Sequence, residues 1–227
     1  MFFISVPSDA VPAAELIVMQ DKNLHMVFIF DIGNVLINFD IRKLLQKIAN
    51  NSGLSIDQIL GLFDKPELLE VETGKISGKN YFEHLVKTTG IKWNYDDWIK
   101  AWADIYEINE IGFNLLKELK SKKYSVYILS NLAEYNRDAI EIKVPEILIE
   151  TEYNFYSFEL GYHKPDPRIY QEVCARLSMH PANCVFIDDM QENVDGAISI
   201  GMEGIVYRNE MIEGIESKIN TIIQKAA

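Results

Sequence analysis

The sequence predicts an α/β fold with a mainly parallel sheet and a long helical insertion after the first strand. Short continuous apolar runs, which suit strands buried on both faces, recur along the chain. Helical patterns separate the later runs, as in sheets whose parallel strands are joined by helices. After the first run, about 65 residues show helix signals but no clear strand, which is too long for an ordinary connection.

The first predicted strand covers residues 27–30 and ends at Asp31. Further strands are predicted at residues 126–129, 184–187 and 204–207. The carboxyl ends of parallel strands lie on one edge of a sheet, and ligands bind there. Residues that directly follow these runs are therefore candidates for a common site.

Capping signals predict where several helices begin and end. Pro167 suits the first position of a helix over residues 166–178, and Gly201 suits the end of a helix over residues 190–201. Within the insertion, Ser55 begins a capping-box pattern.

These patterns divide the chain into three parts. Residues 1–25 are expected to form an N-terminal extension, and residues 26–39 and 108–227 the α/β core. Residues 40–107 are expected to form the helical insertion, in which Asn94 marks a helix start ahead of a tryptophan stripe.

Composition narrows the class of protein. The 227 residues include 22 Lys and Arg against 34 Asp and Glu, a net charge of −12, which argues against binding to nucleic acid or to an anionic membrane. No apolar run approaches the ~18 residues of a membrane helix. The two cysteines lack CxxC spacing and indicate buried thiols in a reducing compartment. We therefore expect a soluble, cytoplasmic protein, whose oligomeric state the sequence does not indicate.

Chemically active side chains gather at the predicted strand ends. Asp31 follows the first strand, Asp188 and Asp189 end another, Ser130 ends a third, and Lys164 precedes a helix. Carboxylate oxygens are hard ligands suited to a Mg²⁺ ion that also meets a substrate phosphate. A carboxylate beside such an ion can attack phosphorus and form an aspartyl-phosphate. The pattern predicts a magnesium-dependent site for phosphoryl chemistry.

Four segments in this order resemble the motifs of the haloacid dehalogenase-like (HAD) hydrolase superfamily. They are FDIGNVL around Asp31, ILSN ending at Asn131, GYHKPDPRIY around Lys164 and FIDDMQENVDGA around Asp188. The resemblance implies a Rossmann-like (HAD-type) core with residues 40–107 as a C1-type cap. The DIGN form and the KPDPRIY segment are similar to those of sugar-phosphate phosphatases of the α-D-glucose-1-phosphate phosphatase type. A Mg²⁺-dependent phosphatase acting on a small phosphorylated metabolite is implied, with a sugar phosphate as one candidate.

The resemblance also implies roles around the metal. Asp31 would be both the nucleophile and a metal ligand, and the backbone carbonyl of Gly33 would be a second ligand. Asp188 would bind the ion directly or through water, with Asp189 supporting it.

The resemblance also implies that three residues bind the phosphoryl group of the substrate. Ser130 would hydrogen-bond it, aided by the amide of Asn131, and Lys164 would neutralise charge on nucleophile and phosphate. Asn34 is a further candidate for substrate binding, with fixing of the loop as its alternative role.

One departure from the family pattern concerns proton transfer. Most phosphatases of the superfamily carry an acid–base Asp two residues after the nucleophile, where this chain has Gly33. Such help is typically worth ~10²–10⁴-fold in rate. Asp40, His163 and Glu72 are candidate substitutes, although Asp40 precedes a helical pattern and suits a capping role. Asn193 stands where many relatives have another Asp, which lowers the negative charge beside the metal.

Two alternatives follow from this departure. In a 2-haloacid dehalogenase the nucleophile attacks carbon and the halide leaves without a proton, so that Gly33 would cost little. Such chemistry needs no Mg²⁺, however, and leaves Asp188 and Asp189 without a purpose. The other alternative is a catalytically weak domain that binds a phosphorylated ligand.

Overall fold

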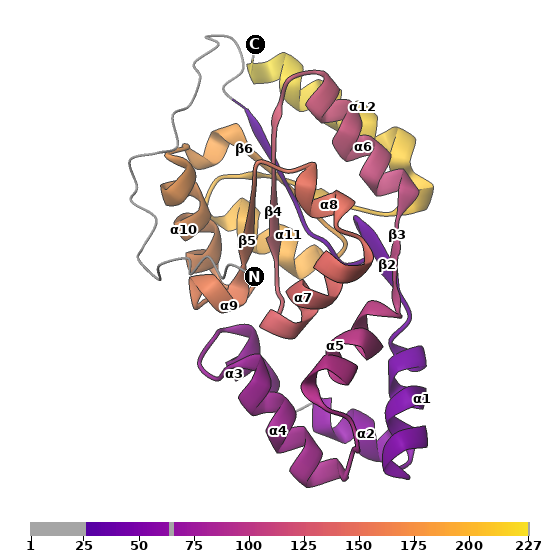
Figure 1. Ribbon diagram of the computed structural model, residues 1–227. Coiled ribbons are helices and arrows are strands. Elements are labelled where there is room, and N and C mark those ends of the chain that lie inside the picture. Colours follow the sequence, from indigo (N-terminus) through magenta and orange to yellow (C-terminus); the bar gives the residue numbers. More distant parts are fainter. Residues whose placement is uncertain (1–25, 64–65, 227) are drawn as a thin grey trace, which may run out of the picture.

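The central feature of the fold is a parallel sheet. The computed structural model describes residues 26–63 and 66–226, and the predicted extension at residues 1–25 lies outside them. Within the described ranges, five parallel strands form one sheet in the order β5-β4-β1-β6-β7 (Figure 1). These strands are β1 (Val27–Phe30), β4 (Ser125–Ser130), β5 (Tyr153–Tyr156), β6 (Cys184–Asp188) and β7 (Glu203–Val206). The predicted α/β class and parallel sheet are confirmed.

The strand β1 is buried on both faces, as its continuous apolar sequence requires. Phe28 and Phe30 belong to an apolar core with α6 (Glu110–Ser121) and α12 (Ile212–Ala226). The alternate residues Val27 and Ile29 belong to a second core, with α10 (Pro167–Leu177). The two-residue period of the strand thus distributes its side chains between two helical layers.

The predicted insertion contains a group of helices between β1 and β4. Figure 1 shows these helices together below the sheet. They are α1 (Ile41–Ser52), α2 (Ile56–Phe63), α3 (Pro66–Glu72), α4 (Gly78–Thr89) and α5 (Tyr95–Ala103). Ser55 and Gln58 form the expected reciprocal capping box, and Asn94 caps α5. Trp98 of α5 is fully buried in their common core.

Short strands join the insertion to the core, and they correct the prediction that residues 40–107 contain no strand. β2 (Ile37–Phe39) pairs antiparallel with β3 (Tyr106–Ile108), so that Tyr106 and Glu107 belong to a strand. β5 was also not predicted. Each of these segments contains a polar residue that interrupts its apolar run, and they become strands by pairing with distant segments, which local patterns do not reveal.

The other predicted helices are confirmed. Asp166 caps α10 and Pro167 occupies its first turn, while α11 (Gln191–Ser199) ends just before Gly201. The remaining elements are α7 (Glu134–Lys143), α8 (Glu146–Ile149), α9 (Ser157–Leu160) and short 3-10 turns at Pro181–Asn183 and Asn209–Met211.

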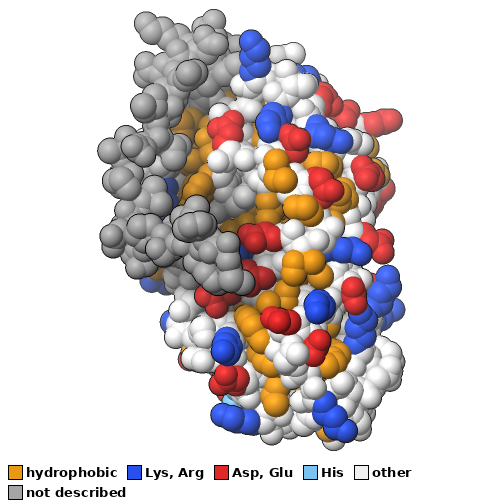
Figure 2. Space-filling model, in the orientation of Figure 1, with side chains coloured by type: hydrophobic (Ala, Val, Ile, Leu, Met, Phe, Trp, Pro, Cys, Tyr) orange, Lys and Arg blue, Asp and Glu red, His pale blue; other side chains and the backbone are white. Residues whose placement is uncertain are grey.

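The distribution of charged side chains and the state of the two cysteines agree with what the composition predicts. Figure 2 shows acidic and basic side chains interspersed over the visible face, with apolar side chains between them. Cys174 and Cys184 are buried free thiols, as predicted. Among the helices that the structure describes, none combines the length and apolar character needed to cross a membrane.

Gly112 allows α6 to pack against the chain that follows the first strand. A methyl group at this position would overlap the backbone carbonyl of Val35. Since interiors are close-packed, such an overlap must displace backbone. Gly112 therefore helps to hold the segment that leads from Asp31 to β2.

We predict that Gly112→Ala lowers the free energy of unfolding by about 1–3 kcal/mol, because overpacking displaces backbone. Urea denaturation would measure it. Gly61→Ala is the matched control, because Gly61 lies within α2 with open space around it, and alanine there should stabilise by about 0.5–1 kcal/mol. Equal effects at both positions would contradict the packing described.

Candidate functional site

Asp31 lies directly after β1, the central strand. One oxygen of its carboxylate accepts hydrogen bonds, and the other accepts none from described residues. Its backbone N–H donates to Ile187 O at 2.8 Å. Its Oδ1 accepts hydrogen bonds from Ser130 Oγ at 2.8 Å and from Lys164 Nζ at 2.7 Å. Within the described part of the chain, no residue donates a hydrogen bond to Oδ2. The predicted neighbours Ser130 and Lys164 therefore orient the carboxylate and leave one oxygen available.

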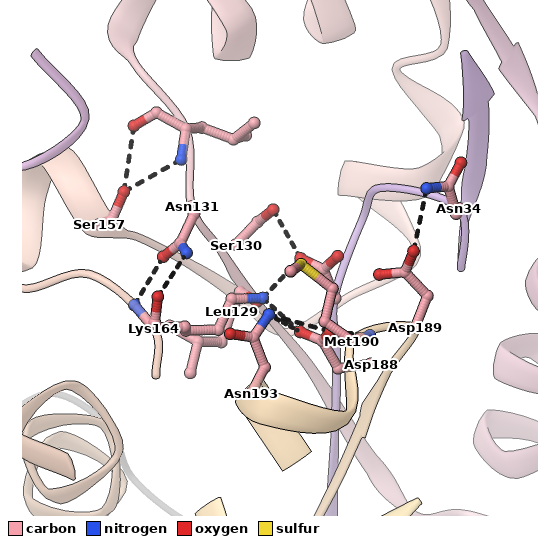
Figure 3. Close-up of polar contacts among 12 residues, drawn as sticks. Asn34, Leu129, Ser130, Asn131, Ser157, Lys164, Asp188, Asp189, Met190 and Asn193 are labelled. Atoms are coloured by element: carbon pink, nitrogen blue, oxygen red, sulfur yellow. Dashed lines mark hydrogen bonds and ion pairs between the residues drawn. The ribbon is translucent and has the colours of Figure 1, made fainter. Parts of the chain in front are cut away.

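The ammonium group of Lys164 links the two strand ends that carry carboxylates. Besides Asp31, its Nζ donates to Asp188 Oδ2 at 2.6 Å and to Leu129 O at 3.1 Å. Only 2% of Lys164 is exposed, so the ammonium group depends on these partners. Figure 3 shows the side chain extending toward Asp188 and Asn193. A lysine from a loop thus brings together the ends of β1, β4 and β6.

Asp188 is fully buried and receives hydrogen bonds at both oxygens. Met190 N donates to Oδ1 at 2.8 Å, and Asn193 Nδ2 lies 3.0 Å and 3.1 Å from the two oxygens. These donors stabilise the charged carboxylate. Asn193, noted in the sequence only as a missing carboxylate, is therefore a direct partner of Asp188 in the structure.

Asn34 and Asp189 contact each other beside the site. Asn34 Nδ2 donates to Asp189 Oδ2 at 3.0 Å, and Arg208 donates to the Asp189 carbonyl. Asn34 has a φ of 54°, a conformation that asparagine tolerates better than most residues. The contact ties the loop after β1 to the loop after β6, and both residues line the cavity described below.

Asn131 lies beside the lysine and holds its backbone. Asn131 Oδ1 accepts from Lys164 N at 2.9 Å, and Nδ2 lies 3.1 Å from both Lys164 O and His163 Nδ1. Ser157 accepts a hydrogen bond from Leu132 N at 3.0 Å and so fixes the same loop. Sequence reasoning missed Ser157, because only the pairing of β4 with β5 brings it close.

The charges in the site suit a divalent cation. Oxygens of Asp31, Asp188 and Asp189 lie within 4.8 Å of one another, a separation that a partly hydrated Mg²⁺ can bridge. Burial, reinforced by Asp188 and opposed by Lys164, raises the pKa of Asp31 to about 6. Burial would lower the pKa of Lys164, but Asp31 and Asp188 outweigh it and raise that pKa. One ammonium group thus compensates the carboxylates only in part, and the free oxygens fit a hard cation.

A cavity of about 390 Å³ opens beside these groups, between the core and the helical insertion. Asp31, Gly33, Ser130, Asn131 and Lys164 line one side of it, together with Asn34, Asp189 and Asn193. The insertion supplies the other side from α1, α2, α3 and α5, together with the joining strands β2 and β3. The site is therefore completed by residues from both parts of the chain.

The neighbourhood of Gly33 is apolar. A methyl group at Gly33 would lie 3.3 Å from the ring of Phe39 and 3.7 Å from Asp31 Oδ2. Phe39 therefore borders the space into which an acid–base side chain at position 33 would extend. Sequence reasoning did not identify Phe39, because the turn between β1 and β2 brings the two residues together.

The three candidate proton carriers occupy different places. Asp40 caps α1 through Arg42 N at 3.0 Å and is absent from the cavity lining of the described residues. Glu72, at the end of α3, lines the cavity. His163 Nε2 lies 3.0 Å from Glu72 Oε2, so a core loop holds this carboxyl group in place.

Comparison with known families places the chain among hydrolases. The family model described as haloacid dehalogenase-like hydrolase matches residues 25–201. Flavin mononucleotide hydrolase 1 of Arabidopsis thaliana is 36% identical over 96 residues, which are 42% of this chain and only 38% of that protein. D-ribitol-5-phosphate phosphatase of Bacteroides thetaiotaomicron is 24% identical over 185 residues, 77% of this chain and 88% of that protein.

Solved structures share the fold. An HAD family enzyme from Bacteroides thetaiotaomicron, in complex with magnesium and inorganic phosphate, superposes with a TM-score of 0.71 at 23% identity, covering 81% of this chain and 94% of that one. An HAD-like family hydrolase from Porphyromonas gingivalis gives a TM-score of 0.74 at 24% identity, covering 86% and 98%. At these identities the similarity is one of fold.

We predict that Lys164→Met lowers the free energy of unfolding by about 3–5 kcal/mol when divalent cations are chelated, because it leaves buried carboxylates without their cation. Urea denaturation in EDTA would measure the loss. Lys122→Met is the control: Lys122 pairs with Glu118 at 2.6 Å on the surface, where a pair is worth about 0–1 kcal/mol. Similar losses in both variants would contradict the central role of Lys164.

Proposed function

Because the chain belongs to the haloacid dehalogenase-like hydrolase family, we propose that it is a Mg²⁺-dependent phosphatase that hydrolyses a small phosphorylated metabolite. The observation that carries this proposal is the carboxylate of Asp31, whose Oδ1 is held by Ser130 and Lys164 while Oδ2 carries no hydrogen bond from described residues. An oriented carboxylate with one available oxygen at the edge of a cavity is suited to nucleophilic attack.

In the proposed reaction, Asp31 Oδ2 attacks phosphorus, and the bond between phosphorus and the substrate oxygen breaks. The alkoxide takes up a proton and leaves as an alcohol. Water then attacks phosphorus of the aspartyl-phosphate and loses a proton, which releases inorganic phosphate and restores the Asp31 carboxylate. Lys164 and Ser130 hold the attacking group in position throughout.

Asp31, Asp188 and Asp189 would hold the metal, with the carbonyl of Gly33 as a further candidate ligand. The ion would supply positive charge next to the phosphate oxygens. Its fit is supported by the close carboxylate oxygens and by their incomplete compensation. We propose Asn131 and Asn34 as residues that shape the phosphate pocket through Lys164 and Asp189, and residues 40–107 as a cap over it.

Glu72 is the proposed proton carrier in place of the residue missing at Gly33. Of the three candidates, it alone is in the cavity lining formed by described residues. Its bond to His163 holds the carboxyl group near the cavity while leaving its other oxygen available. Glu72 would give its proton to the leaving alkoxide and take one from the attacking water.

A dehalogenase is the second candidate. It is favoured by Gly33 and the apolar ring beside it, because halide departure requires no proton. (S)-2-haloacid dehalogenase 4A of Burkholderia cepacia is 32% identical over 122 residues, 54% of this chain and 51% of that protein. The grouped carboxylates favour the metal-dependent phosphatase instead.

We predict that Asp31→Asn lowers the turnover of p-nitrophenyl phosphate by about 10³-fold or more, because the amide is a poor nucleophile. Phosphate release would be measured, with circular dichroism to verify folding. Asp195→Asn, an exposed change on α11, serves as the control and should retain activity. EDTA should abolish the activity and added Mg²⁺ restore it. Release of halide from a 2-haloacid in EDTA would instead identify a dehalogenase.

We predict that Glu72→Gln slows phosphoryl transfer from an alkyl phosphate by about 10²–10⁴-fold, because the alkoxide needs a proton. Transfer from p-nitrophenyl phosphate should change little, because its phenolate is stable when it leaves. Single-turnover kinetics would measure the transfer step alone.

Glu134→Gln is the control for Glu72→Gln, because Glu134 also bridges the insertion and the core, accepting from Gly78 N at 2.8 Å. Equal slowing of both substrates in Glu72→Gln would show that Glu72 has a structural role.

A further inference from the structure

The wall of the cavity that faces the carboxylates is built from apolar side chains. Phe39 of β2, Leu60 and Phe63 of α2, Leu68 of α3 and Trp102 of α5 all line it. They come from four elements that meet only in the folded chain. Apart from Glu72, the charged groups lie on the core side, so the phosphate end of a ligand and its other end would meet different chemistry.

Several polar atoms on this wall are already bonded to protein, whereas the hydroxyl of Tyr135, which also lines the cavity, has no hydrogen bond with described residues. The hydroxyl of Tyr106 accepts from Asn136 Nδ2 at 3.0 Å, and Asn136 Oδ1 accepts from Ala133 N at 3.2 Å. One oxygen of Glu72 is bonded to His163. Trp102 Nε1 is buried without a partner among described residues. A group with several hydroxyls would leave some of them unsatisfied, which is costly in an apolar site.

The wall also begins next to the reacting atoms. The ring of Phe39 borders Gly33, which itself lies beside Asp31 Oδ2. Phe39 and Leu60, which both line the cavity, are 38% and 45% exposed. Covering this surface with an apolar group is favourable. The leaving group, which departs from the side away from the attacking oxygen, is the part of a substrate that would cover it.

We propose that the physiological substrate is the phosphate monoester of an apolar, cyclic or aromatic alcohol and not a sugar phosphate. This inference rests on the proposed phosphatase function and specifies its substrate class. A cavity of about 390 Å³ is of the size that binds small ligands. The apolar wall binds the hydrocarbon part, and the charged core side binds the phosphate.

The test compares two esters of the same shape, cyclohexylmethyl phosphate and glucose 6-phosphate. Both are primary alkyl phosphates on a six-membered ring, and the ring oxygen makes glucose the slightly better leaving group, which works against the proposal. We expect kcat/KM to be about 100-fold higher for the cyclohexyl ester, because several hydroxyls would lose hydration in the cavity. An equal or higher value for glucose 6-phosphate overturns the proposal.

A matched pair of variants on α3 tests whether the preference for the cyclohexyl ester arises in the cavity. Leu68 lines it, whereas its neighbour Leu69 lies outside that lining and is 50% exposed. Leu68→Asn should lower the ratio of the two kcat/KM values about tenfold, and Leu69→Asn should leave the ratio unchanged. Because each ratio is taken on one protein, partial unfolding does not affect it. An unchanged ratio in Leu68→Asn overturns the assignment of this wall.

Failure of the phosphatase proposal is distinguishable from failure of this one. If neither ester nor p-nitrophenyl phosphate is hydrolysed, the phosphatase proposal fails. Binding of both esters to Asp31→Asn in Mg²⁺, measured by calorimetry, then decides the ligand preference. At least tenfold tighter binding of cyclohexylmethyl phosphate supports an apolar pocket, and equal or weaker binding overturns it.

Discussion

Lys164 places its ammonium group between the carboxylates of Asp31 and Asp188 and against the carbonyl of Leu129, in a position almost closed to water. The three partners come from β1, β6 and β4, which are adjacent in the sheet. A buried ammonium group requires such partners, and the carboxylates require it in return. Asn131 holds the lysine backbone, so the loop that carries Lys164 and the carboxylates of Asp31 and Asp188 belong to one hydrogen-bonded network.

This network also explains how an acidic protein can receive an anion. The net charge is −12, and Figure 2 shows charges of both signs interspersed over the visible face. Within the site, donors surround Asp188, and the pKa of Asp31 is raised. A cation and Lys164 would give the pocket the positive charge that phosphate needs, whatever the charge of the whole chain.

The two sides of the cavity have separate origins. The core contributes carboxylates, a lysine and amides at its strand ends, whereas the insertion contributes mostly apolar side chains and Glu72. Gly33 and Phe39 mark the boundary between them. Apart from Glu72, changes in the apolar side chains of the insertion would leave the charged groups at the strand ends in place.

The sequence by itself determined the features that depend on local pattern. The apolar runs identified β1, β4, β6 and β7, and the carboxylates at the ends of β1 and β6 located the charged site. Capping residues such as Ser55 and Asn94 placed helix starts.

Only the tertiary structure decided which distant groups meet. The β2–β3 pair and the Glu72–His163 contact join segments far apart in the sequence, whose approach no local pattern records. Long-range packing sets these contacts, because it depends on the path of the whole chain and not on the spacing of neighbours. The strand ends thus indicated the chemistry from sequence, and the fold determined what surrounds it.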